Sequence, residues 1–130
     1  MAQRVLVDTD VLIDHLRGVE QATQALLVHD RLAISVITLA ELLAGAKGAR
    51  EQADIDALAA DCEVLPVDEP TARVAGILRK RYGPSHGVQL PDALIAAAAQ
   101  THQLPLLTLN SKHYPMLPGL RPAYRKSSGA

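Results

Sequence analysis

The stretch VLVDTDVL, residues 5–12, places two acidic residues between two apolar runs. Residues 5–7 are continuously apolar, which is typical of a strand buried on both faces of a parallel sheet. Asp8 comes directly after this run, and a carboxylate at such a place is paired, bound to a metal or held at a rim. Asp10 is predicted to N-cap the helix that follows. The stretch therefore predicts a strand, an acidic turn and a helix, the opening unit of an α/β fold.

Short apolar runs and amphipathic stretches alternate through the rest of the chain. The apolar runs predict further strands at residues 32–36, 64–67 and 106–109, the second of them near an edge because it contains Pro66. Helical spacing predicts helices that begin at Asp10 and Thr38 and others over residues 21–29, 50–60, 68–82 and 91–103. Gly83 and Pro84 are predicted to end the helix that Asp68 caps. This alternation predicts a three-layer α/β/α sandwich with a central parallel sheet of four to five strands.

The composition is that of one globular domain, predicted to span residues 1–124, followed by a polar tail at residues 125–130 that is predicted to be disordered. Aromatic residues make up 2% of the chain, with no Phe or Trp, so the core must be built from aliphatic side chains. The formal net charge of −1 provides no global field that attracts nucleic acid or membranes. Any nucleic-acid binding must therefore be local or mediated by a metal.

Cysteine usage and hydropathy predict a cytoplasmic protein with no membrane association. Cys62 is the one cysteine of the chain and cannot form an internal disulfide, which suits a reducing compartment. Asp8 interrupts the first apolar run too early for a secretory signal. No segment is apolar for long enough to span a bilayer.

Four polar residues stand at places that suit one metal site: Asp8, Glu41, Asp92 and Asn110. Asp8 and Asn110 follow predicted strands, whereas Glu41 and Asp92 lie in the first turns of predicted helices. Strand carboxyl ends and the helix starts after them share one edge of a parallel sheet, where ligands bind. Carboxylates brought together there repel each other unless a cation binds them, and oxygen ligands suit Mg²⁺ or Mn²⁺. The pattern predicts a metal-dependent enzyme that acts on phosphate esters.

Purely structural roles compete with this interpretation. Thr38 and Glu41 have the spacing of a capping box, in which Glu41 would only stabilise a helix start. Asp92 suits the positive end of a helix dipole, and Asn110 is a common turn residue. Asp14, one turn beyond Asp10, is predicted to be solvated.

Four blocks carry a resemblance to a known family: VLVDTDVLID, ISVITLAELLAG, LPDALIAAAA and LLTLNSKHY. In order and spacing they resemble the PIN-domain ribonucleases, and more narrowly the VapC toxins of bacterial and archaeal toxin–antitoxin pairs. The resemblance extends over residues 4–120. It implies a Mg²⁺- or Mn²⁺-dependent endoribonuclease that leaves a 3′-hydroxyl and a 5′-phosphate.

The resemblance also implies roles for single residues. Asp8, Glu41 and Asp92 match the family's metal ligands. Many members carry a further acid in the last block, where this chain has Asn110 and His113. Asn110 would then orient a water or the phosphate, and Asp10 is a possible further metal ligand.

Family members are usually homodimers inhibited by a cognate antitoxin, here of the VapB type. By analogy with them, an apolar helix of the antitoxin would lie against the first two helices and place an Arg or Lys among the carboxylates. The apolar residues predicted to receive it are Leu12, Leu16, Leu26 and Leu27.

Two other function classes use parts of the same pattern. A haloacid-dehalogenase-like phosphatase would use Asp8 as nucleophile and Asp10 as general acid, but it needs an acid pair after a later strand. A receiver-like signalling domain, which is not an enzyme, would use Asp68 as phosphoacceptor and Lys112 as its lysine. Both leave Glu41 without a role.

Overall fold

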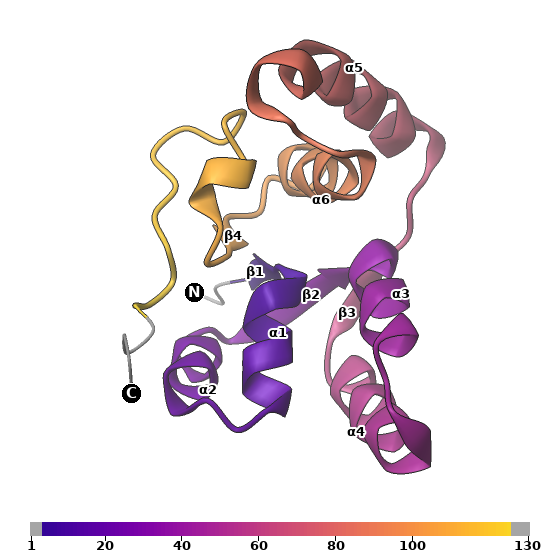
Figure 1. The fold of residues 1–130 in the computed structure, drawn as a ribbon, viewed down its shortest axis with the longest axis vertical. Helices are drawn as coiled ribbons and strands as arrows, with labels where there is room; N and C mark the ends of the chain where they lie inside the picture. The colour runs from indigo at the N-terminus through magenta and orange to yellow at the C-terminus, as the bar shows by residue number, and fades with distance from the viewer. Residues whose placement is uncertain (1–3, 126–130) are drawn as a thin grey trace.

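A parallel sheet forms the centre of the computed structural model, which describes residues 4–125, and helices cover both of its faces (Figure 1). The strands, in the order β3-β2-β1-β4, are β1 (Arg4–Val7), β2 (Arg31–Ser35), β3 (Glu63–Leu65) and β4 (Leu106–Leu107). The helices are α1 (Thr9–Leu16), α2 (Glu20–Leu27), α3 (Val36–Ala44), α4 (Gly48–Ala60), α5 (Glu69–His86), α6 (Leu90–Thr101) and the 3₁₀ helix η1 (Ser111–His113). This confirms the predicted α/β/α sandwich with a sheet of four parallel strands, and β3 lies at an edge as Pro66 indicated.

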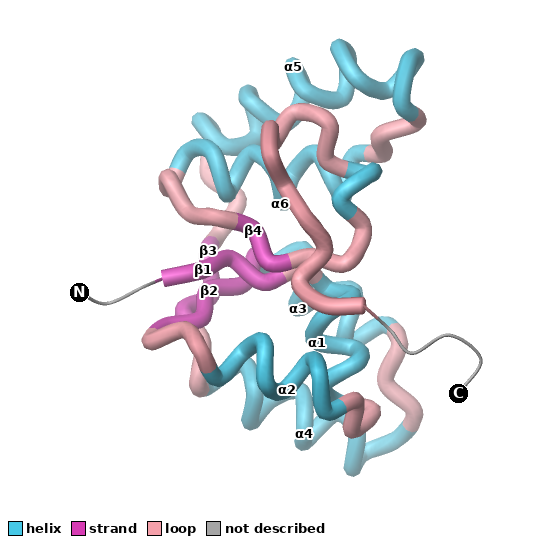
Figure 2. The backbone as a smooth tube through the Cα atoms, turned by 90° about the vertical axis from the view of Figure 1, so that its left-hand side faces the viewer, coloured by secondary structure: helices cyan, strands magenta, loops and turns pink. Residues whose placement is uncertain are grey.

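The sheet separates two apolar cores. Neighbouring strand residues point to opposite faces, so Leu6 and Ala33 face one core while Val5 and Ile34 face the other. Figure 2 shows α5 and α6 on one side of the sheet, and α1, α2 and α4 on the other. The central strands are buried on both faces, which explains their continuous apolar runs.

Small side chains bring α6 close to its neighbours. Ala93 and residues 96–99 are all buried in the core on that side of the sheet. The helix packs along α5 and begins at the carboxyl edge of the sheet, with Asp92 in its first turn. Tight packing of the alanine face therefore fixes the direction in which Asp92 leaves the helix.

Several predicted helix boundaries were wrong. Asp8, not Asp10, is the N-cap of α1 and accepts a hydrogen bond from the backbone N–H of Thr9. The helix α3 begins at Val36 behind the N-cap Ser35, which places Thr38 inside its first turn. In both cases the helix starts directly where the strand ends, one or two residues before the expected cap.

The ends of two other elements also differ from expectation. The helix α5 continues through Pro84, which lies in its last turn, and stops at Gly87 in the left-handed conformation (φ 67°). A proline near a helix end removes one hydrogen bond without breaking the preceding turns. Asp68 caps this helix as predicted. The strand β4 is shorter than predicted, because Thr108 already turns toward Asp8.

Two further expectations concern the surface and the chain end. The helix predicted over residues 21–29 would bury Val28 on its inner face, but Val28 is 74% exposed. The predicted tail lies outside the described residues except for Arg125. Within residues 4–125, no helix is both long and apolar enough to cross a membrane.

Candidate active site

The carboxyl ends of three neighbouring strands meet around Asp8. The backbone N–H of Asp8 donates to the carbonyl of Leu107 at 2.9 Å, which extends the pairing of β1 with β4 by one step. Its carboxylate is 6% exposed and cannot be solvated by bulk water. It must therefore be satisfied by protein donors or by a ligand.

Three donors reach the Asp8 carboxylate. Oδ1 accepts from the backbone of Thr9 at 2.8 Å. Oδ2 accepts from the hydroxyls of Thr108 at 2.7 Å and Tyr114 at 2.8 Å. A carboxylate offers about four acceptor positions. Asp8 thus keeps one acceptor position, on Oδ1.

Asp92 lies close to Asp8, because the Tyr114 hydroxyl contacts both carboxylates. The space onto which Asp8, Asp92 and Glu41 face is called the cleft below. Its Oδ1 is 3.4 Å from the Tyr114 hydroxyl, and its Oδ2 is 3.4 Å from Nδ1 of His113. Burial raises the pKa of Asp92, and the negative charges of Asp8 and Glu41 raise it further, while His113 opposes them. The negative charges of Asp8 and Glu41 are therefore close enough to Asp92 to disfavour its ionised form.

Glu41 reaches the same space from α3. It lies in the second turn of that helix, so the expected capping box with Thr38 does not form. Its exposed carboxylate accepts instead from the Thr9 hydroxyl at 2.7 Å, and that hydroxyl is also 3.0 Å from the hydroxyl of Thr38. Glu41 therefore does not cap α3, and its carboxylate instead lies beside Thr9, the residue that follows Asp8.

Asp10 and Asn110 form a separate polar pair beside the cleft. Oδ1 of Asp10 accepts from the backbone of Val11, and Oδ2 accepts from the backbone of Leu109 and from Nδ2 of Asn110, both at 3.0 Å. A longer contact of 3.4 Å joins the same oxygen to Thr108. Burial, followed by the charge of Asp8, raises the pKa of Asp10 to about 6.

Sequence reasoning missed three hydroxyl donors of the site: Thr9, Thr108 and Tyr114. Thr and Tyr carry no distinctive signal, although Thr108 directly follows an apolar run as Asp8 does.

Asp14 was predicted to be solvated but is 4% exposed, and it accepts from the hydroxyl of Tyr124 at 2.7 Å. The C-terminal segment, distant in sequence, folds back to cover it.

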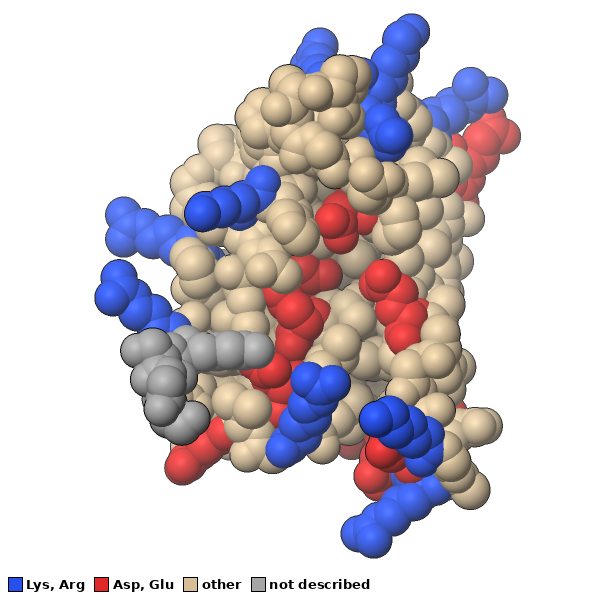
Figure 3. All heavy atoms as spheres, viewed as in Figure 1, with Lys and Arg blue, Asp and Glu red and all other residues tan. Residues whose placement is uncertain are grey.

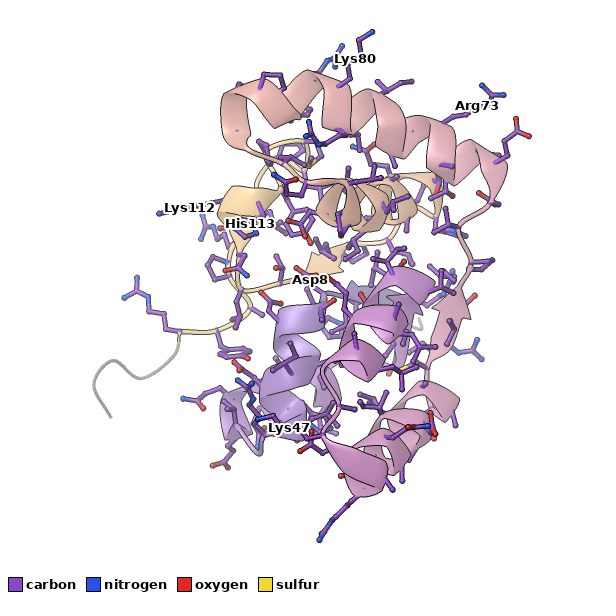
Figure 4. The ribbon with its side chains drawn as sticks, turned by 45° about the vertical axis from the view of Figure 1, so that its right-hand side comes forward. Asp8, Lys47, Arg73, Lys80, Lys112 and His113 are labelled. Atoms are coloured by element: carbon purple, nitrogen blue, oxygen red, sulfur yellow. The ribbon has the colours of Figure 1, made fainter. Side chains whose placement is uncertain are left out.

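Charge is distributed unevenly over the face that carries the cleft. Figure 3 shows acidic side chains gathered in a hollow in the middle of this face, with Lys and Arg toward its rim. In Figure 4, Asp8 lies between the two helical layers, and Lys112 and His113 flank it from η1. Arg73 and Lys80 point outward from α5, away from the cleft.

The donor set suits a hard divalent cation in its chemistry. Asp8, Glu41 and Asp92 offer only oxygen atoms, as Mg²⁺ and Mn²⁺ prefer. In the described part of the chain, no three Asp, Glu, His or Cys side chains are already grouped closely enough to hold a metal ion. The carboxylates would have to draw together around a cation, which would also relieve the repulsion that raises the pKa of Asp92.

A parallel α/β/α sandwich with a carboxylate cleft at the carboxyl edge of its sheet defines the class of this protein. The PIN domain family matches residues 5–115, so the chain belongs to the PIN-domain family.

Two relatives named as ribonucleases and one solved structure are similar over almost the whole chain. Ribonuclease VapC10 of Mycobacterium tuberculosis is 44% identical over 124 residues, which cover 92% of each chain. Ribonuclease VapC19 of the same organism is 40% identical over 125 residues, covering 92% of this chain and 98% of the relative. A toxin–antitoxin complex from Klebsiella pneumoniae contains a chain with a TM-score of 0.82 at 32% identity, covering 94% of this chain and 99% of that one.

Proposed function

We propose that this protein is a metal-dependent endoribonuclease and the toxin of a toxin–antitoxin pair. The observation that carries the proposal is the carboxyl edge of a PIN domain at which the Tyr114 hydroxyl contacts both Asp8 and Asp92, and Thr9, the residue after Asp8, donates to Glu41. The names of the relatives, ribonucleases and a toxin–antitoxin complex, support the same activity.

Asp8, Glu41 and Asp92 would hold Mg²⁺ or Mn²⁺. A bound divalent cation supplies Lewis-acid charge stabilisation for a phosphodiester and lowers the pKa of water. Asp8 is held by the backbone N–H of Thr9 and Glu41 by the Thr9 hydroxyl, so these two side chains have little entropy left to lose on binding.

Asn110 would position the phosphate or the attacking water. Its Nδ2 donates to Asp10, which fixes the plane of the amide. Both lone pairs of Asp10 Oδ2 are filled by the backbone N–H of Leu109 and by Nδ2 of Asn110, so this oxygen has no capacity left for a metal. We assign Asp10 to orienting Asn110, in preference to the role of an additional metal ligand.

The activity is tested with purified protein and a structured RNA. We expect cleavage with Mg²⁺ or Mn²⁺ and none after EDTA, with activity restored by excess Mn²⁺. Sequencing the RNA ends would identify the substrate and check for the 5′-phosphate. Cleavage that continues unchanged in EDTA would overturn the metal-dependent mechanism.

Neither rival function finds support in the site. The receiver-like interpretation needs Asp68 as phosphoacceptor, yet that carboxylate caps α5 by accepting from the backbone of Thr71 at 2.9 Å. The phosphatase interpretation leaves Glu41 unexplained, although Glu41 shares the cleft with Asp8. Failure to hydrolyse phosphatase substrates or to react with acetyl phosphate would exclude both directly.

An antitoxin of the VapB type is the proposed protein partner. A groove of about 400 Å³ lies between α1, α3 and α4, and Glu41 stands on its lining. Its apolar wall consists of Ile13, Leu16, Leu42 and Ile55. Of the residues predicted to receive an antitoxin helix, Leu12 and Leu26 are buried in the core instead. An apolar antitoxin helix bound in this groove would lie next to Glu41. An Arg or Lys on that helix could then reach the carboxylates of the cleft.

Insertion of a cation is tested by changing Asp8 and Asp92 together to Asn. We expect binding of the antitoxin to weaken, because a buried Arg or Lys would lose its charged partners. Unchanged affinity would remove the insertion while leaving the groove as a binding site.

Two coarser expectations complete the proposal. A homodimer, which the family resemblance implies, is checked by light scattering, and α5 and α6 expose Ile77 and Leu90 as apolar contacts for it. A cytoplasmic location, expected from the single cysteine, is checked by cell fractionation.

A further inference from the structure

Tyr114 brings a polar atom into an otherwise apolar core. It is the largest fully buried side chain, 1% exposed, and lies in the core between the sheet and α6. Neighbouring side chains of that core are Leu6, Ile95 and Ala96. Packing alone would be satisfied by a ring without the hydroxyl, so the hydroxyl group needs its own explanation.

The hydroxyl contacts two carboxylates of the cleft. It is 2.8 Å from Oδ2 of Asp8 and 3.4 Å from Oδ1 of Asp92. A phenol carries one hydrogen, and the shorter contact has the length of a normal O–H···O hydrogen bond. Tyr114 therefore donates to Asp8, and its oxygen is also in contact with Asp92.

This bond determines which oxygen of Asp8 is available. Tyr114 and Thr108 both donate to Oδ2 and fill its two lone pairs. Oδ1 accepts only from the backbone of Thr9 and keeps one acceptor position. The two hydroxyls thus hold the carboxylate in one orientation and leave a single oxygen for a ligand.

We propose that Tyr114 is a positioning residue: its hydroxyl orients Asp8 and spaces it from Asp92, so that the two carboxylates bind one divalent cation. The role rests on the proposed metal-dependent function. Donors behind a metal ligand typically contribute 10- to 100-fold to metal affinity or activity.

The chain contains a matched control for this role. Tyr124 donates to a second buried carboxylate, Asp14, at 2.7 Å. Tyr114→Phe and Tyr124→Phe each remove one phenolic hydroxyl from a buried aspartate and keep the ring. Only the first change affects a carboxylate of the cleft.

Binding of Mn²⁺ is measured by titration calorimetry in the full chain, beside RNA cleavage and thermal melts in EDTA. For Tyr114→Phe we expect the Kd for Mn²⁺ to rise by roughly 10- to 100-fold and kcat at fixed Mn²⁺ to fall, with little change in the KM for RNA. Tyr124→Phe should leave both the Kd for Mn²⁺ and kcat at the wild-type values. Thr108→Val, which removes the other donor to the same oxygen, should raise the Kd as Tyr114→Phe does and serves if that variant fails to fold.

The outcomes separate this role from the proposed function. Suppose that the wild type binds Mn²⁺ and cleaves RNA. If Tyr114→Phe then retains both properties, the positioning role is wrong and the function stands. Where Tyr114→Phe does not fold, the same conclusion follows if Thr108→Val retains both properties. Equal losses in Tyr114→Phe and Tyr124→Phe would likewise overturn it, since a general loss of stability would explain both. A wild-type protein that neither binds Mn²⁺ nor cleaves RNA would overturn the proposed function together with this role.

Discussion

Asp8 and Asp10 stand two residues apart at the start of one helix, yet their surroundings differ. Asp8 accepts from three donors, keeps one acceptor position and interacts with Asp92 across a cleft. Asp10 also accepts from three donors, two backbone N–H groups and the side-chain amide of Asn110. The difference lies in the neighbours: Asp8 shares the Tyr114 hydroxyl with a second carboxylate, Asp92, whereas Asp10 faces an amide, so charge alone does not mark a ligand-binding carboxylate.

Neutralising Asp8 or Asp92, the two carboxylates that contact the Tyr114 hydroxyl, should have the largest effect on activity. For Asp8→Asn and for Asp92→Asn we expect RNA cleavage to fall by about 10²-fold or more, as when a main charge-stabilising group is removed. Asn is as good an N-cap as Asp, so Asp8→Asn should keep its helix. Cleavage rates and thermal melts in EDTA check both points, and rates near wild type would remove these residues from the site.

Glu41→Gln should cause a smaller loss, since Glu41 is the most exposed of the three carboxylates. The amide oxygen can still accept from Thr9, so the local structure is retained. We expect Mn²⁺ affinity and cleavage to fall by roughly 10-fold to 100-fold. The melting temperature in EDTA should not decrease, because one like charge has left the cleft. A variant that cleaves RNA normally and melts earlier in EDTA would return Glu41 to a structural role.

The orienting role of Asp10 predicts a milder defect that a second change can repair. Asp10→Asn places an amide opposite the amide of Asn110, and we expect roughly tenfold slower cleavage with metal affinity retained. Adding Asn110→Asp exchanges the two groups, so that the amide at position 10 donates to the carboxylate at position 110. This double variant should recover part of the rate. Loss of Mn²⁺ binding in Asp10→Asn would instead make Asp10 a metal ligand.

Stability in EDTA should depend on pH through Asp10. Its folded pKa of about 6 lies above the ordinary value of 3.8, so between these values the folded state binds more protons than the unfolded chain. The free energy of unfolding should therefore fall as pH rises from about 4 to about 6, with no further loss from this group above that range. The free energy of unfolding of the wild type and of Asp10→Asn is measured with urea at each pH. If this free energy depends on pH equally in the two proteins, Asp10 does not make the contribution.

The smallest effect is expected far from the cleft. Arg73 and Glu69 form an exposed pair at 2.8 Å on α5, with both side chains about three-quarters exposed (Figure 4 shows Arg73). Arg73→Ala should change the free energy of unfolding by no more than about 0.5 kcal/mol and leave cleavage unchanged. A clear loss of cleavage would extend the functional surface to α5.

Local pattern was sufficient for most of the fold. Continuous apolar runs predicted β1 and β2, because strands buried on both faces of a parallel sheet consist mainly of hydrophobic residues. The caps of α1 and α3 were misplaced by two and three residues, since Asp8 and Ser35 cap these helices directly at the strand ends. The end of α5 was misplaced because a proline in the last turn does not stop a helix.

The sequence by itself determined the α/β architecture, the family resemblance and the set of acidic residues, because all three depend on residue type and spacing along the chain. Only the tertiary structure decided what each acid does. Thr108 and Tyr114 lie about a hundred residues from Asp8, and their hydroxyls reach it only because β4 pairs with β1. The hydrogen bonds that Asp10 accepts from Leu109 and Asn110 arise in the same way. Hydrogen bonds between distant segments form only after the sheet has assembled, and no local pattern records them.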